Sequence, residues 1–311
     1  RCVLALYSYD DNPDGLEIAN LLRQSLDLIA RFPTMITHAY AVKKHYYDEG
    51  SLVLHHPNPS ISSAENLLYM IRDNHVYTKE EAEILDLCLI LHAEHGGGNN
   101  SAFSVRVMSS TNTDTYSAIS AAIGSLKGPK HGGANDKMLS QMNEIKANVT
   151  DWKNEDEVLE YLCKIIRKEA GDGKGLIYGT GHAVYTVSDP RAVILKERAK
   201  ALAESKGRSE EFALYDLVER LAPLAFEKVK GEKRLLCANV DFYSGFVYQM
   251  LDIPQELFTP IFAMSRIVGW CAHRVEEVLT GGKIIRPAYK SISKRSPYVE
   301  IDERTVPDMV E

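Results

Sequence analysis

Residues 154–166, which have the sequence NEDEVLEYLCKII, contain the pattern that decides the fold. Apolar residues recur there every three or four positions, and this spacing places them on one face of an α-helix. Asn154 followed by Glu157 is typical of a helix start, because both side chains can bond the free N–H groups of a first turn. The segment predicts an amphipathic helix with a buried face made of Val158, Leu159, Leu162, Ile165 and Ile166.

The same spacing recurs along most of the chain, whereas the alternation typical of β-strands is scarce. A helix is predicted after Thr78, which begins a capping box, and another after Ser209, with Pro223 expected to kink or end it. A further helix is predicted from about Pro260 to Leu279, before Gly281. The sequence therefore predicts an all-α protein.

The character of these helices changes after His131, where polar and charged amphipathic segments begin. We interpret residues 137–245 as a small helical domain inserted into a larger helical domain. Residues 1–136 and 246–311 would form the large domain. Because the sequence opens at Arg1 rather than at Met, we expect the large domain to lack its N-terminal part.

The composition is that of a soluble globular protein, with 311 residues, 45% hydrophobic and 25% charged. The net charge of −7 gives no general electrostatic reason to bind nucleic acid or an anionic membrane. No apolar run approaches the roughly 20 residues that a membrane span needs. The five cysteines are widely spaced among apolar neighbours, which favours reduced thiols and a cytoplasmic location.

Four short segments place a titratable side chain beside glycine. They contain His95 before Gly96-Gly97-Gly98, His131 within 128–135, His182 within 179–185, and Asp241 within 239–245. Glycine lets the backbone come close to a ligand, so four such segments predict a binding site. One of them continues into Asp189-Pro190-Arg191, where a capping residue and a first-turn proline predict the start of a helix.

The expected environments of Asp241 and His131 suit acid–base chemistry. Asp241 lies between Val240 and Phe242, where desolvation should raise its pKa and let it act as a general base; a plain helix cap is the alternative. His131 is expected to open a helix, and the positive end of the helix dipole there disfavours imidazolium. A neutral imidazole can donate a hydrogen bond to a developing enolate oxygen.

Three arginines have apolar neighbours rather than runs of acids: Arg191, Arg266 and Arg286. Together they could hold a small dicarboxylate, because guanidinium binds carboxylate in a bidentate manner; alternatively each pairs with a structural acid. His92, His95, His131 and His182 could also surround a metal ion. No familiar metal motif occurs, so we predict no metal site.

The order and spacing of six segments resemble the citrate synthase family. They are His92 to Asn99, Gly128 to Asn135, Gly179 to Arg191, Asn239 to Gly245, Phe262 to Arg266, and Arg286-Pro287. The resemblance implies a citrate synthase-like fold and a homodimer. It also implies condensation of acetyl-CoA with oxaloacetate and water to give citrate and CoA, with no cofactor besides these substrates.

The resemblance also implies a role for individual residues. His131 looks like the histidine that bonds the thioester carbonyl, Asp241 like the base that removes the methyl proton, and His182 like the histidine that activates the ketone. The oxaloacetate-binding residues of the family match His95, Arg191, Phe262 and Arg266, and also Arg286, which would serve the partner subunit's site. The loop that contacts the adenine of CoA matches Leu176, Ile177, Tyr178 and Gly179.

Two alternatives remain open at this point. A 2-methylcitrate synthase, which uses propionyl-CoA, shares all of these segments. A non-catalytic helical binding or scaffold protein with the same fold would need the arginines but not Asp241 as a base. The presence of His131, His182 and Asp241 together argues for an enzyme.

Overall fold

The computed structural model describes residues 1–181, 185, 187–234, 236–288, 290–293, 295 and 297–304. Within these residues the regular elements are α-helices and short 3-10 helices, and Thr180 and Ala238 form an isolated β-bridge. The elements are α1 (Cys2–Ala5), η1 (Leu6–Tyr9), α2 (Ile18–Tyr47), α3 (Ser63–Ile71), α4 (Lys79–His92), α5 (Asn100–Ser109), α6 (Thr115–Leu126), α7 (Ala134–Asn148), α8 (Glu155–Arg167), α9 (Pro190–Ser205), α10 (Ser209–Lys230), α11 (Val240–Met250), η2 (Gln255–Leu257), α12 (Phe258–Thr280) and η3 (Ile301–Glu303). The predicted all-α class is confirmed.

The helix that begins after Thr78 starts as predicted. Thr78 and Glu81 form a complete capping box at α4. At α8, Asn154 accepts hydrogen bonds from the N–H groups of the first turn. The Glu157 carboxylate, however, accepts from the backbone N–H groups of residues 150 and 151 instead of returning to Asn154, so only half of a capping box forms there.

Of the two effects predicted for Pro223, a kink or an end, the end does not occur, because α10 continues to Lys230. Proline removes one backbone hydrogen bond, yet its fixed φ angle is compatible with a helix. Leu221, Ala222 and Ala225 around it are buried, and α10 packs along α8. Tertiary packing of the apolar face therefore outweighs the local cost of the proline.

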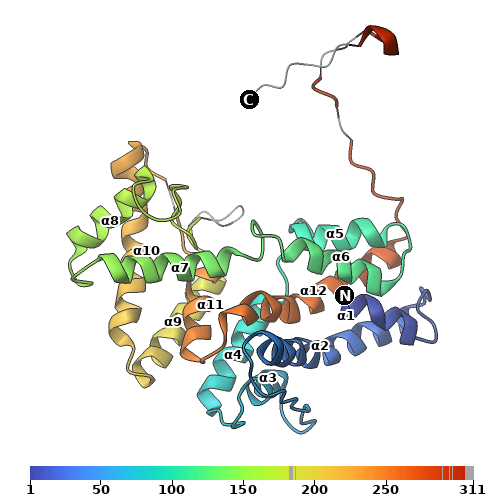
Figure 1. Cartoon of the computed structure of the whole chain (residues 1–311), viewed down its shortest axis with the longest axis horizontal. Coiled ribbons are helices and arrows are strands. Elements are labelled where there is room, and N and C mark those ends of the chain that lie inside the picture. The colour runs from blue at the N-terminus through green and yellow to red at the C-terminus, as the bar shows by residue number, and fades with distance from the viewer. Residues whose placement is uncertain are drawn as a thin grey trace.

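The helices form two groups (Figure 1). In one group α8 packs on α10, and α11 packs on α7 and α9; in the other, α12 packs on α2, α4, α5 and α6. Contacts of α4 with α9 and α11 connect the groups. The buried side chains of α12 include Trp270, Arg266 and Arg274, so this helix forms much of the central core. The described helices include none long and apolar enough to cross a membrane.

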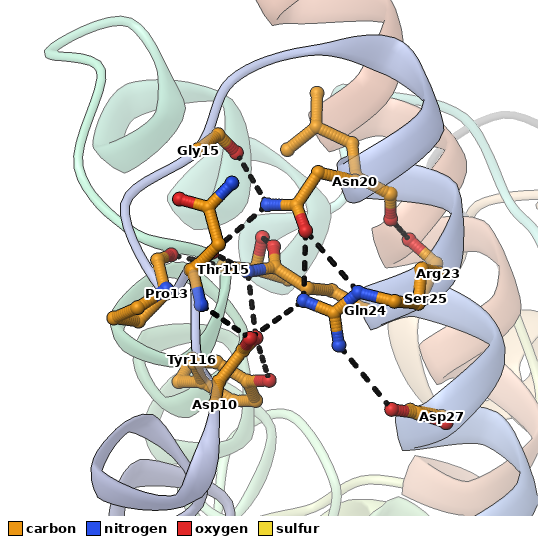
Figure 2. Close-up of polar contacts among 12 residues, drawn as sticks. Asp10, Pro13, Gly15, Asn20, Arg23, Gln24, Ser25, Asp27, Thr115 and Tyr116 are labelled. Atoms are coloured by element: carbon orange, nitrogen blue, oxygen red, sulfur yellow. Dashed lines mark hydrogen bonds and ion pairs between the residues drawn. The ribbon is translucent and has the colours of Figure 1, made fainter.

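A polar network fixes the segment before α2 to α2 and α6 (Figure 2). The Asp10 carboxylate, 3% exposed, accepts hydrogen bonds from Arg23 at 2.6 Å, Gln24 at 3.0 Å and Tyr116 at 2.6 Å. Burial alone would raise its pKa, but these hydrogen bonds outweigh that effect and lower the pKa to about 2. Gln24 in turn accepts from Thr115, so the segment before α2, α2 and α6 meet at one buried cluster.

Candidate active site

The predicted site residues meet at helix ends around a cavity of about 980 Å³. His95 follows α4, His131 precedes α7, Arg191 and Asp241 lie in the first turns of α9 and α11, and two residues come from α12. The lining includes His95, His131, Arg191, Asp241, Phe262 and Arg266 from the predicted set, with Glu94, Asn99, Lys130, Tyr185 and Asn239 in addition. Six of the predicted residues, far apart in sequence, therefore share one cavity.

Asp241 is placed by the start of α11. Asn239 caps this helix by accepting a hydrogen bond from the backbone N–H of Asp241, so the Asp241 side chain is not needed as the cap. Burial raises the pKa of Asp241 to about 6, although the nearby positive charges of Arg191 and Arg266 oppose the rise. The predicted direction of the pKa shift is confirmed, and the carboxylate suits a general base near neutral pH.

His131 does not open a helix, contrary to the prediction. It lies in the turn of residues 128–133, and α7 begins at Ala134 with Gly133 as its N-cap. A Cβ at Gly132 would overlap the carbonyl oxygen of Leu126, so this tight turn requires glycine. Burial, followed by the charge of Arg266, lowers the pKa of His131. Its imidazole is therefore neutral as expected, but desolvation replaces the helix dipole as the reason.

The Nε2 atom of His131 lies 3.1 Å from the Ser101 hydroxyl, a contact that the sequence did not indicate. Ser101 also contacts the Asn99 side chain at 2.8 Å and accepts a hydrogen bond from Trp270 Nε1 at 3.2 Å. Because Nε2 is occupied, Nδ1 is the nitrogen of His131 left for a ligand.

The three arginines differ in their partners. Arg191 forms a bidentate pair with Asp189, its own helix cap, at 3.0 and 2.8 Å, as the alternative interpretation expected. Arg266 is 1% exposed; its Nε donates to the carbonyl of His92 at 2.5 Å, and its guanidinium lies 4.8 Å from the ring centre of Phe262. Its Nη1 has no hydrogen-bond partner among the described residues. A buried donor on a cavity wall suits an anionic ligand.

Burial lowers the pKa of Arg266 to about 10, so it remains charged at neutral pH. His92 lies fully buried behind this wall, where its Nδ1 donates to the Cys88 carbonyl at 2.8 Å and burial lowers its pKa to about 3. Of the predicted histidines, His92 therefore has a structural role beside Phe262. The described residues contain no group of three or more His, Cys, Asp or Glu side chains arranged to hold a metal ion.

The glycine segment 179–181 is tied to the residues that precede α11. The carbonyl of Gly179 accepts from the N–H of Asn239 at 2.9 Å, and the N–H of Gly181 donates to the carbonyl of Cys237 at 2.7 Å. Both glycines have positive φ angles, +71° and +80°. His182, which follows directly, lies outside the described residues, so its predicted role is not tested.

The loop predicted to contact adenine lies at a second cavity of about 390 Å³, lined in part by Leu176 and Ile177. The Gln141 side chain fixes this loop: it donates to the carbonyl of Leu176 and accepts from the N–H of Tyr178, both at 2.9 Å. Arg234 lines the same cavity. Arg286 is exposed in the segment after α12 and lines neither cavity.

Comparison with known proteins agrees with this arrangement. Residues 1–288 match the family profile described as "Citrate synthase, C-terminal domain". The chain belongs to the citrate synthase family. The citrate synthase of Synechocystis is 39% identical over 280 residues, which cover 90% of this chain. The chain spans 64% of the length of that relative.

Solved citrate synthase structures have the same fold. The enzyme of Pyrobaculum aerophilum matches 97% of this chain and 72% of its own, with a TM-score of 0.74 and 31% identity. The Thermoplasma acidophilum enzyme, solved in a ternary complex with carboxymethyl coenzyme A and oxaloacetate, has a TM-score of 0.74 and 30% identity. The match covers 97% of this chain and 74% of the Thermoplasma acidophilum chain.

Proposed function

We propose that this member of the citrate synthase family condenses acetyl-CoA with oxaloacetate and water to give citrate and CoA. The observation that carries the proposal is one cavity that holds a carboxylate with a raised pKa, a neutral imidazole and a buried arginine with a free donor. Removal of the weakly acidic thioester methyl proton needs a base and an enolate stabiliser at the same time. Asp241 and His131 supply these two groups.

In the first step, the Asp241 carboxylate takes a proton from the methyl group. The C–H electron pair moves into the C–C bond, and the thioester oxygen accepts a hydrogen bond from Nδ1–H of His131. In this proposal the Ser101 hydroxyl turns its single proton from Asn99 Oδ1 to Nε2 of His131, 3.1 Å away, which leaves the imidazole proton on Nδ1. This hydrogen bond from the neutral imidazole then stabilises the developing charge on the thioester oxygen.

In the second step, the enolate carbon attacks the ketone carbon of oxaloacetate, and the ketone oxygen gains a proton, in this proposal from His182. Water then cleaves the thioester, which releases CoA and citrate. Arg266 and Arg191 hold the oxaloacetate carboxylates; Asp189 already pairs with Arg191 and keeps its guanidinium in place. His95 and Phe262 complete the contacts with the dicarboxylate.

The adenine of CoA would lie against Leu176, Ile177, Tyr178 and Gly179, whose backbone Gln141 fixes. We further propose that residues 137–245 form a small domain that closes over the large one, since water must be kept from the intermediates. We also expect a cytoplasmic location, because all five cysteines are free thiols.

We also propose a homodimer in which Arg286 reaches the partner subunit's site. The segment after α12 leaves the helices in an extended form and carries the exposed apolar residues Ile284, Ile292, Tyr298 and Ile301 (Figure 1). Such a segment has apolar surface to cover, and a second copy of the chain is the partner that the proposal requires.

The test measures citrate formation by the purified protein and its Asp241→Ala variant, with acetyl-CoA and with propionyl-CoA. We expect wild-type turnover and no turnover by the variant, which should fold normally. The ratio of the two kcat/KM values decides between citrate and 2-methylcitrate synthesis, since one methylene changes pocket binding by roughly 1–3 kcal/mol. Oxaloacetate binding without thioester consumption would favour a non-catalytic binding protein.

A further inference from the structure

One face of α12 holds the end of α4 in place. Residues Ser265, Arg266, Gly269 and His273 are spaced three and four apart along this face. Ser265 Oγ donates to the carbonyl of Leu89, and Arg266 Nε donates to that of His92. Both carbonyls belong to the last turn of α4, where helix carbonyls lack partners within the helix. The face thus caps α4 from the side.

The same face continues past α4 to the turn that carries His95. The Glu94 carboxylate accepts from the backbone N–H of His95 at 2.8 Å, from that of Gly96, and from His273 Nε2 at 3.0 Å. Since a carboxylate can only accept, Nε2 of His273 is the donor. One carboxylate oxygen, Oε1, therefore connects the His95 turn to α12.

Gly269 makes this connection possible. A Cβ at this position would overlap Oε2 of Glu94 and the carbonyl oxygen of Ala93, so only glycine allows the turn to lie this close to α12. His273, two turns beyond Arg266, is mostly buried, with 13% of its side chain exposed. It lies between the carboxylates of Glu94 and Glu276.

Glu94 also poses an electrostatic problem for a dicarboxylate site, because it lines the same cavity as His95 and Arg266. Repulsion between this carboxylate and an anionic ligand weakens binding unless the negative charge is compensated. The two backbone N–H groups and His273 provide that compensation. They also hold the pKa of Glu94 below its ordinary value although burial alone would raise it.

We infer that Glu94 and His273 are a pair of positioning residues that hold the His95 turn in its substrate-binding form and compensate the carboxylate beside the dicarboxylate site. Neither residue needs to touch the reacting atoms. The inference rests on the proposed function for the identity of the dicarboxylate, oxaloacetate. It predicts that loss of the pair weakens oxaloacetate binding far more than it slows the chemical steps.

The test compares His273→Leu, which removes the donor, with His273→Gln, which keeps a donor at similar reach. We expect His273→Leu to raise the Kd and KM of oxaloacetate about tenfold, as loss of a hydrogen bond to a charged group does. Its kcat and its KM for acetyl-CoA should stay within twofold. Amide hydrogen exchange of residues 95–98 should become faster. His273→Gln should bring both the oxaloacetate affinity and the exchange rate most of the way back to the wild-type values.

Two further variants complete the design. Glu94→Ala should speed the exchange of residues 95–98 as His273→Leu does, but should raise the Kd of oxaloacetate less, because it also removes the carboxylate that repels the ligand. The double variant should be no worse than His273→Leu, because both changes act through one contact. His45→Leu, the same substitution at an exposed histidine near Gly50, should change nothing. If His273→Leu fails to fold, the Glu94→Ala and His273→Gln variants carry the test.

Unchanged oxaloacetate affinity and unchanged exchange in His273→Leu would overturn the inference, as would a loss confined to kcat. Failure of the proposed function has a different signature, since wild-type protein would then neither bind oxaloacetate nor consume acetyl-CoA. The hydrogen exchange of residues 95–98 does not depend on turnover, so it still tests the contact in that case.

Discussion

Asp241→Asn should stabilise the protein at neutral pH while it removes the proposed activity. Burial raises the pKa of this carboxyl from 3.8 to about 6, so folding favours the neutral form of the Asp241 side chain over the anion. Asparagine resembles the neutral acid in shape and cannot ionise. The substitution therefore removes a buried charge without opening a cavity.

The size of the effect follows from the two pKa values. At about 1.36 kcal/mol per pKa unit, the difference corresponds to about 3 kcal/mol. The folded-state pKa is raised, so the wild-type protein keeps the favourable contribution below pH 3.8 and loses it as the pH rises through about 6. Relative to wild type, Asp241→Asn should gain stability over this window and keep a constant advantage above it.

Urea unfolding of both proteins at several pH values between 3 and 8 measures this difference. The free energy of unfolding of the variant minus that of wild type should rise by about 3 kcal/mol across the range. Citrate formation by the same samples should be lost in the variant. A stability difference that does not change with pH would refute the assigned pKa and, with it, the reason why Asp241 suits a base near neutral pH.

Two other predictions concern the buried cluster near the N-terminus and the His131 turn. Asp10→Asn should lower the free energy of unfolding by about 2 kcal/mol at pH 7, because hydrogen bonds hold the pKa of Asp10 near 2. This loss should shrink as the pH falls below 3.8, where wild-type Asp10 becomes protonated, and urea unfolding measures it. Gly132→Ala should displace the His131 turn, since the added Cβ meets the backbone carbonyl of Leu126. We expect kcat/KM for acetyl-CoA to fall at least tenfold while far-UV circular dichroism stays helical. Normal activity would contradict this turn geometry.

Local sequence patterns predicted the starts or ends of several helices because the signals are local. The capping box at Thr78, the N-cap at Asp189 and the C-terminal glycine at Gly281 each depend on residues within one turn of the helix end. The pattern failed where distant contacts decide. Pro223 remains inside α10 because that helix packs on α8, and His131 lies outside α7 because the turn of 128–133 closes onto α6.

The candidate site shows the same division. The glycine-rich segments and the isolated arginines marked most of the cavity lining, because the residue types themselves suggested the chemistry. Ser101, Gln141 and Glu94 gave no comparable signal. Each of these side chains contacts a residue distant in sequence or a backbone group. A serine, glutamine or glutamate is common in helices and loops, so its residue type alone does not indicate such a contact.

The sequence by itself determined the helical class, the family and the residues that can do the chemistry, because these depend on periodicity and on residue type. Only the tertiary structure decided how each group behaves. It desolvates Asp241 and His131, pairs Arg191 with Asp189, leaves a donor of Arg266 free at the cavity, and places His273 beside Glu94. Charge, pKa and pairing depend on what surrounds a group in space, and α12 and the helix ends around it bring those surroundings together.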